Sequence, residues 1–143
     1  MLTLIVDDSA LVRRMLREIL VQIEGTEVVG EFDSPAPAIE SIRSRPPDIV
    51  LLDIQLANGS GLEVLRIVRM EHPSVKVMVF TNFSESVYRK RCLEAGAYAF
   101  YDKKSDLQVL RQSLHGLASA ARVESGDVDV NHQHSWWETR NMG

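Results

Sequence analysis

The chain has 143 residues and a mass of 16.1 kDa, which fits one domain with a single hydrophobic core. Apolar residues make up 45% of it, and an excess of acidic over basic residues (20 against 16) argues against nucleic acid as the default partner. No apolar run is long enough to span a membrane. The single cysteine, Cys92, predicts a reducing, cytoplasmic setting.

Short apolar runs alternate along the chain with longer stretches of helical period. The runs predicted as strands are, in chain order, Leu2–Val6, Val28–Phe32, Ile49–Leu52, Val75–Phe80 and Tyr98–Tyr101. After the first run, apolar residues recur at helical spacing from Val12 to Ile23, and after the last run leucines do so from Leu107 to Leu117. The pattern therefore predicts five strands, each followed by a helix.

Capping signals predict where three of these helices begin. Ser34 stands before a proline, and proline is favoured at the first helical position. Ser60-x-x-Glu63 and Ser105-x-x-Gln108 have the form of capping boxes, in which side chains satisfy free backbone N–H groups. We therefore expect helices to begin directly after Ser34, Ser60 and Ser105.

The alternation predicts an α/β fold, a (βα)5 flavodoxin-like doubly wound parallel sheet with the strand order 2-1-3-4-5. Strands one, three and four are almost wholly apolar, as strands buried on both faces must be. Strand two contains Gly30 and Glu31, which favours an edge position. Ligands of such sheets bind beyond the carboxyl ends of the strands where the winding reverses, here between strands one and three.

Three carboxylates fall at this place, because strand one ends in Asp7-Asp8 and strand three ends in Asp53. An unpaired cluster of acids is repulsive, and Mg²⁺ relieves the repulsion because it prefers carboxylate oxygens, waters and phosphate oxygens. Taken alone, Asp8 or Ser9 is better explained as the cap of the first helix. The convergence of three acids nevertheless predicts a Mg²⁺ site.

Two further strand ends add polar groups to the same edge. Thr81 follows strand four and contributes a hydroxyl, and Lys103 follows strand five and contributes an ammonium. Acids, a hydroxyl and a fixed cation together suit phosphoryl transfer, which depends mainly on positioning and on charge neutralisation.

With these residues the chain resembles a known family, the receiver domains of two-component response regulators. The resemblance covers residues 2 to about 121, so it implies a receiver domain at 1–121, followed by a polar C-terminal tail at 122–143 that contains Trp136 and Trp137. It further implies a stand-alone, chemotaxis-type receiver architecture. The matching pieces are Ile5-Val6-Asp7-Asp8-Ser9, Ile49-Val50-Leu51-Leu52-Asp53, Phe80-Thr81, and Ala95-Gly96-Ala97 leading to Lys103.

The resemblance assigns the acids their roles. It implies that Asp53 accepts the phosphoryl group and that Asp8 binds Mg²⁺ directly. Asp7 would assist through water, and Gln55 would supply a backbone carbonyl to the metal. Mg²⁺ is accordingly the expected cofactor.

The remaining roles concern the phosphoryl oxygens and the switch. The resemblance implies that Thr81 and Lys103 bind phosphoryl oxygens and that Phe100 is the aromatic switch residue. Lys103 is chosen over Lys104 because it keeps the family's seven-residue distance from Gly96. The chain departs from the family's pattern at Lys104, where a proline is usual, and in the residues that follow Asp53 and Thr81.

The implied function is that of a phosphoaccepting receiver in a phosphorelay, a signalling domain that catalyses only its own phosphorylation and slow dephosphorylation. Its donor would be a sensor histidine kinase or a phosphotransfer protein. Its output would be a protein partner or a homodimer, reached through the face of helix four, strand five and helix five, without direct nucleic acid binding or a membrane span. The alternative is a pseudo-receiver, a phosphorylation-independent interaction module, against which the intact acid set argues.

Two further expectations concern the lifetime of the phosphoryl group and the tail. Gln55 and Phe83 occupy the positions that border the path of the attacking water in receivers. An apolar ring turned inward there predicts slow loss of the phosphoryl group, whereas a ring that lies flat on the fourth helix would leave the path open. Trp136 and Trp137 would expose a large apolar surface unless they dock on this domain or on a partner.

Overall fold

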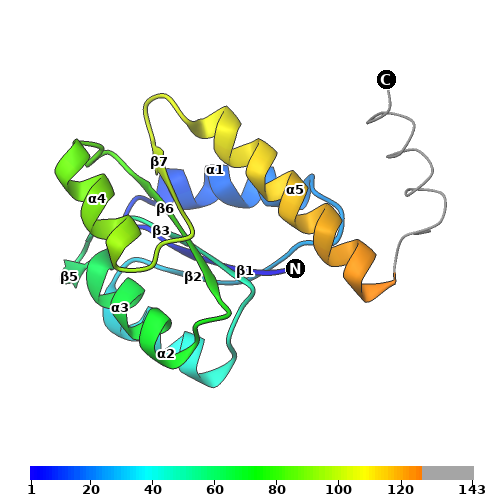
Figure 1. Cartoon of the computed structure of the whole chain (residues 1–143), viewed down its shortest axis with the longest axis horizontal. Coiled ribbons are helices and arrows are strands. Elements are labelled where there is room, and N and C mark those ends of the chain that lie inside the picture. Colours follow the sequence, from blue (N-terminus) through cyan, green and yellow to red (C-terminus); the bar gives the residue numbers. More distant parts are fainter. Residues whose placement is uncertain (127–143) are drawn as a thin grey trace.

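The computed structural model describes residues 1–126, so most of the predicted tail, including Trp136 and Trp137, lies outside the described residues. Its main sheet has five parallel strands in the order β2-β1-β3-β6-β7 (Figure 1). Because β6 and β7 are the fourth and fifth predicted strands, this confirms the predicted order 2-1-3-4-5. The strands are β1 (Leu2–Val6), β2 (Glu27–Phe32), β3 (Ile49–Leu52), β6 (Lys76–Thr81) and β7 (Ala99–Asp102). The helices are α1 (Ala10–Val21), α2 (Pro35–Ser44), α3 (Gly61–Glu71), α4 (Ser86–Glu94) and α5 (Leu107–Ser125).

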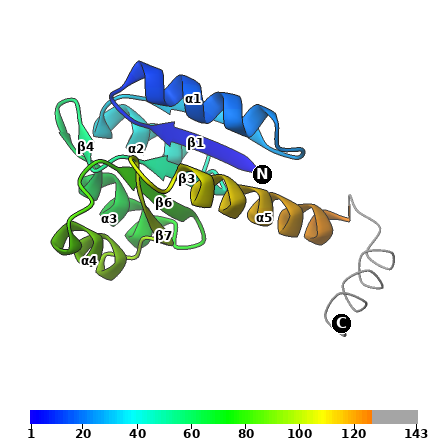
Figure 2. The ribbon, with the colours of Figure 1, turned by 90° about the horizontal axis from the view of Figure 1, so that it is seen from above.

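Two hydrophobic cores lie on the two faces of the sheet, because successive side chains of a strand point to opposite faces. Leu4 and Val6 of β1 pack in the core that also holds residues of α2, α3 and α4. Ile5 packs in the other core, with α1 and with Leu110 and Leu114 of α5. Figure 2 shows these helices as layers on either side of the strands. Among residues 1–126, no helix is long and apolar enough to cross a membrane.

The connection between β3 and α3 contains a hairpin that the sequence did not predict. Strands β4 (Gln55–Leu56) and β5 (Gly59–Ser60) pair antiparallel. The turn between them places Asn58 at φ 59°, a left-handed conformation that asparagine tolerates better than most residues. Strands of two residues are too short to produce a periodic signal in the sequence.

The predicted helix starts hold at two of three positions. Ser34 and Ser60 are the N-caps of α2 and α3, and the Ser60 hydroxyl accepts from the backbone N–H of Leu62 (3.1 Å). The capping box at Ser105 is wrong, because α5 begins one residue later, after Asp106. The Asp106 carboxylate accepts instead from the N–H of Asp102 (2.9 Å) and so ties the end of β7 to the start of α5.

Gly61, the first residue of α3, lies against the backbone that follows β3. Its N–H donates to the carbonyl of Ile54, and a Cβ on Gly61 would stand 2.0 Å from the carbonyl oxygen of Asp53. No side chain fits into this contact. The glycine therefore lets the start of α3 pack directly on the segment that carries Asp53.

A first prediction concerns Thr3, which is fully buried in β1 and whose hydroxyl has no hydrogen-bond partner within residues 1–126. We expect Thr3→Val to raise the free energy of unfolding in urea by about 1 kcal/mol, because the desolvated hydroxyl is replaced by a methyl. Thr26→Val is the matched control and should lower it, since the Thr26 hydroxyl donates to the carbonyls of Leu20 (2.6 Å) and Ile23 (2.9 Å). A destabilised Thr3→Val variant would contradict the prediction.

A second prediction concerns Gly61. We expect Gly61→Ala to lower the free energy of unfolding by about 2 kcal/mol or more, because the added Cβ must displace the Asp53 backbone. Gly116→Ala in α5 is the control, since nothing lies within 4 Å of a Cβ there, and it should raise stability by about 0.5–1 kcal/mol. Urea denaturation of both variants measures the difference, and equal stability of Gly61→Ala and the wild type would refute the close contact.

Candidate functional site

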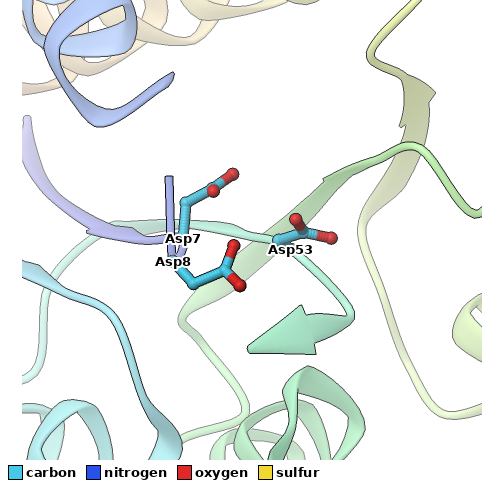
Figure 3. A group of neighbouring side chains, drawn as sticks. All are labelled: Asp7, Asp8 and Asp53. Atoms are coloured by element: carbon cyan, nitrogen blue, oxygen red, sulfur yellow. The ribbon is translucent and has the colours of Figure 1, made fainter. Parts of the chain in front are cut away.

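Three carboxylates meet at the carboxyl edge of the sheet, as Figure 3 shows. Asp7 and Asp8 follow β1 and Asp53 follows β3, two strands that pair in parallel up to Val6 and Leu52. One oxygen of each carboxylate lies within 4.8 Å of the others. Asp7 and Asp53 are buried, with 2% and 6% of their surface exposed, whereas Asp8 is open to solvent.

Lys103 brings a positive charge into the cluster from the loop after β7. Its Nζ lies 2.8 Å from Asp7 Oδ2 and 2.8 Å from Asp53 Oδ2, and its side chain is only 10% exposed. The backbone N–H of Lys103 donates to the carbonyl of Thr81 (2.9 Å), which fixes the loop against the end of β6. The ammonium thus bridges two carboxylates that stand on separate strands.

Thr81 fixes the other oxygen of Asp53. The buried Thr81 hydroxyl donates to Asp53 Oδ1 (2.7 Å), and it accepts from the backbone N–H of Phe83 (3.2 Å). The N–H of Gln55 also points to Asp53 Oδ1 (3.3 Å). Both oxygens of the Asp53 carboxylate are therefore oriented by donors from β4, β6 and the loop after β7.

Burial and charge act against each other in the ion pairs. Burial raises the pKa of Asp7 above its usual value, and the hydrogen bonds from Lys103 and from the N–H of Ser9 offset this only in part. Burial also lowers the pKa of Lys103, but hydrogen bonds to Asp53 and Asp7 outweigh it, so this pKa lies above its usual value. The ammonium therefore stays charged at neutral pH.

The charges of the cluster do not balance, because within residues 1–126 the three carboxylates have one ion-pair partner, the Lys103 ammonium. The donor set consists of carboxylate oxygens, one of them on the exposed Asp8, which is what a hard divalent cation requires. The residues present therefore fit Mg²⁺. Such an ion would remove the remaining negative charge.

The backbone around Asp7 and Asp8 is held by two side chains at the start of α1. The hydroxyl of Ser9 accepts from the N–H of Val12 (3.2 Å), so Ser9 and not Asp8 caps the helix. Arg13 donates to the backbone carbonyl of Asp7 (2.7 Å). Sequence reasoning missed this role of Arg13, since an arginine on an amphipathic helix gives no signal of its own.

The other two residues expected at the site, Phe100 and Phe83, both contact α4. Phe100 in β7 is only 4% exposed, and the guanidinium carbon of Arg89 in α4 lies 5.3 Å from the centre of its ring. The ring of Phe83 packs edge-on against Tyr88 of α4, with ring centres 5.6 Å apart. Phe83 thus rests on α4.

Comparison with known proteins gives the family. A model of the response regulator receiver domain matches residues 3–115. The response regulator GacA of Pseudomonas viridiflava is 33% identical over 125 residues, which cover 87% of this chain and 58% of GacA. The response regulator UvrY of Escherichia coli (strain K12) is 30% identical over 125 residues, 87% of this chain and 57% of UvrY. The chain thus spans a little over half the length of these relatives.

Solved structures agree with the family. A two-component response regulator of the LuxR family from Aurantimonas sp. SI85-9A1 has a TM-score of 0.75 and 28% identity, covering 83% of this chain and 85% of that chain. A chain of the CheX-CheY-BeF3-Mg²⁺ complex from Borrelia burgdorferi has a TM-score of 0.70 and 25% identity, with 90% of each chain covered. With the receiver model matching most of its length, this chain belongs to the receiver domains of response regulators.

Proposed function

We propose that this chain is a phosphoaccepting receiver and that Asp53 takes the phosphoryl group from a phosphohistidine of a sensor histidine kinase or a phosphotransfer protein. The observation that carries the proposal is the orientation of the Asp53 carboxylate by Lys103 and Thr81, beside the two acids that follow β1. A carboxylate oxygen is the nucleophile in this reaction. It forms a P–O bond while the P–N bond of the donor breaks.

Phosphoryl transfer needs neutralisation of the charge on the phosphoryl oxygens. Asp7, Asp8, Asp53 and the backbone carbonyl of Gln55 would hold Mg²⁺, which supplies part of this neutralisation when it is bound. The similar Borrelia complex contains BeF3 and Mg²⁺, which supports the same use of the acids here. Lys103 supplies the rest, because its ammonium already lies 2.8 Å from Asp53 Oδ2.

The output is a change of the surface formed by α4, β7 and α5. Thr81 gives up its hydrogen bond to Asp53 for a phosphoryl oxygen, and Phe100 follows as the switch residue. Exposed apolar side chains on this surface, Val87 and Val109, suit contact with an output protein or a second copy. The output passes through protein contacts, without direct binding of nucleic acid by this domain. The proposed setting is the cytoplasm, where such kinases present their phosphohistidine.

The proposal includes slow loss of the phosphoryl group, with Gln55 and Phe83 next to the path of the attacking water. Phe83 rests on Tyr88 of α4, so its influence depends on whether the ring leaves this contact when Thr81 moves. The alternative, a pseudo-receiver that acts without phosphorylation, has the same fold. The intact acid set and the charged Lys103 favour the first function.

A third prediction tests the acceptor. We expect the wild type, incubated with acetyl phosphate and Mg²⁺, to gain about 80 Da by intact mass spectrometry, and Asp53→Asn to gain nothing. Asp33→Asn is the matched control, because Asp33 follows β2 at the same edge of the sheet and keeps the acid set whole. No adduct on the wild type would favour the pseudo-receiver, and an adduct on Asp53→Asn would move the acceptor to another residue.

A fourth prediction tests the metal. We expect Mg²⁺ to raise the midpoint of thermal unfolding of the wild type, because a ligand that binds only the folded state stabilises it by mass action. Asp8→Ala should abolish the rise, since Asp8 is the exposed acid of the cluster. Asp48→Asn, at the opposite end of β3, should retain it. The same rise in Asp8→Ala as in the wild type would remove Asp8 from the site.

A further inference from the structure

The described residues contain a concave feature at the opposite end of the sheet from Asp7, Asp8 and Asp53. It is a hollow of about 550 Å³ beside the amino ends of the strands, beneath the last turns of α5. Leu117, Ala120 and Ala121 line it from α5, and Met1 and Ile49 line it from the starts of β1 and β3. The orange end of α5 extends beyond the strands (Figure 1).

The lining of the hollow suits a large ring with a polar edge. From α5 the lining comprises the half-buried Leu117 and two alanines, which leave room because alanine has no atoms beyond Cβ, together with Arg122 and Glu124. Asp48 and Lys76 add two more charged groups from the side of the strands. Apolar and polar surface thus contribute about equally to the lining, and an indole matches such a mixed lining because it has both an apolar body and an N–H donor.

The chain itself supplies such rings shortly after α5. Both tryptophans of the protein, Trp136 and Trp137, belong to residues 127–143, which follow the last described residue. Trp136 comes ten residues after Gly126, and a segment of this length can span about 33 Å when extended. Leu117 lies nine residues before Gly126, about 13 Å back along the helix. The length of the segment is therefore sufficient for an indole to reach the hollow.

The end of α5 also favours a return of the chain. Gly126 has φ 81°, in the left-handed region, and its N–H donates to the carbonyls of Arg122 and Val123. A glycine in this conformation after a helix stops the helix and turns the chain away from the helix axis. Gly126 thus ends α5 in a conformation that permits the chain to leave the helix axis.

We propose that residues 127–143 fold back along α5 and that an indole of Trp136 or Trp137 occupies this hollow. Burial of a tryptophan removes about 150–250 Å² from water, and no other ring of this size is present in the chain. The hollow is thereby a docking site for the chain's own C-terminal segment. The proposal is independent of phosphorylation.

Tryptophan fluorescence tests the proposal on the full chain, because both tryptophans lie in the segment that should dock. We expect emission at shorter wavelength, and weaker quenching by acrylamide, than in a free peptide of residues 127–143. Ala121→Asp places a charge in the hollow and should shift emission and quenching to the values of the peptide. Ser119→Asp adds the same charge two residues earlier, at an exposed position that does not line the hollow, and should leave both unchanged.

Three results would overturn the proposal. The first is a wild-type spectrum equal to that of the peptide, which would mean that neither indole is buried. The second is an equal effect of Ser119→Asp and Ala121→Asp, which would place the indoles elsewhere. The third is a wavelength shift that disappears on dilution, which would assign the hollow to a second copy of the chain instead of its own segment.

Discussion

The bridge from the Lys103 ammonium to Asp7 and Asp53 is the interaction on which the charged edge of the sheet depends. The two carboxylates are buried at the ends of neighbouring strands, where repulsion between them is weakly screened. The Lys103 ammonium, 2.8 Å from both carboxylates, offsets their mutual repulsion and the cost of removing them from water. Loss of one partner from such a buried pair typically costs about 3–5 kcal/mol, because it leaves an uncompensated charge. The ends of β1, β3 and β7 are therefore coupled by charge, although β7 forms backbone pairs with neither β1 nor β3.

Backbone contacts make this arrangement possible. Gly61 allows α3 to begin against the carbonyl of Asp53, the β4–β5 hairpin brings the N–H of Gln55 to the same carboxylate, and Arg13 holds the carbonyl of Asp7. Gly61 and Arg13 contact the backbone carbonyls of Asp53 and Asp7, whereas the N–H of Gln55 contacts the Asp53 carboxylate itself. The acids are consequently positioned by rigid strand ends and by tight turns, which is how precise sites are generally built.

The strands, their order and the meeting of Asp7, Asp8 and Asp53 could be predicted because each follows from a local pattern or from the rules of parallel sheets. The hairpin could not, because its strands have two residues each. The predicted start of α5 is one residue too early. The Ser105 pattern depends only on neighbouring residues in the sequence, whereas in the structure the Asp106 carboxylate accepts a hydrogen bond from the N–H of Asp102. The contact of Arg13 with Asp7, and that of Arg89 with Phe100, depend on the reach of long side chains, which no spacing in the sequence encodes.

The length of α5 has a mechanical consequence. The helix begins four residues after Lys103, at the charged edge, and its 19 residues extend for about 28 Å to the other end of the molecule. A rigid rod of this length converts a tilt of about 5° at its start into a displacement of about 2.5 Å at its tip. An ion pair between Arg122 and Glu24 (3.4 Å) anchors the tip to the loop after α1. The helix is thus a lever, in which small rotations beside the carboxylates are opposed at the far end by the Arg122–Glu24 ion pair and by the packing of Ala118 in the core.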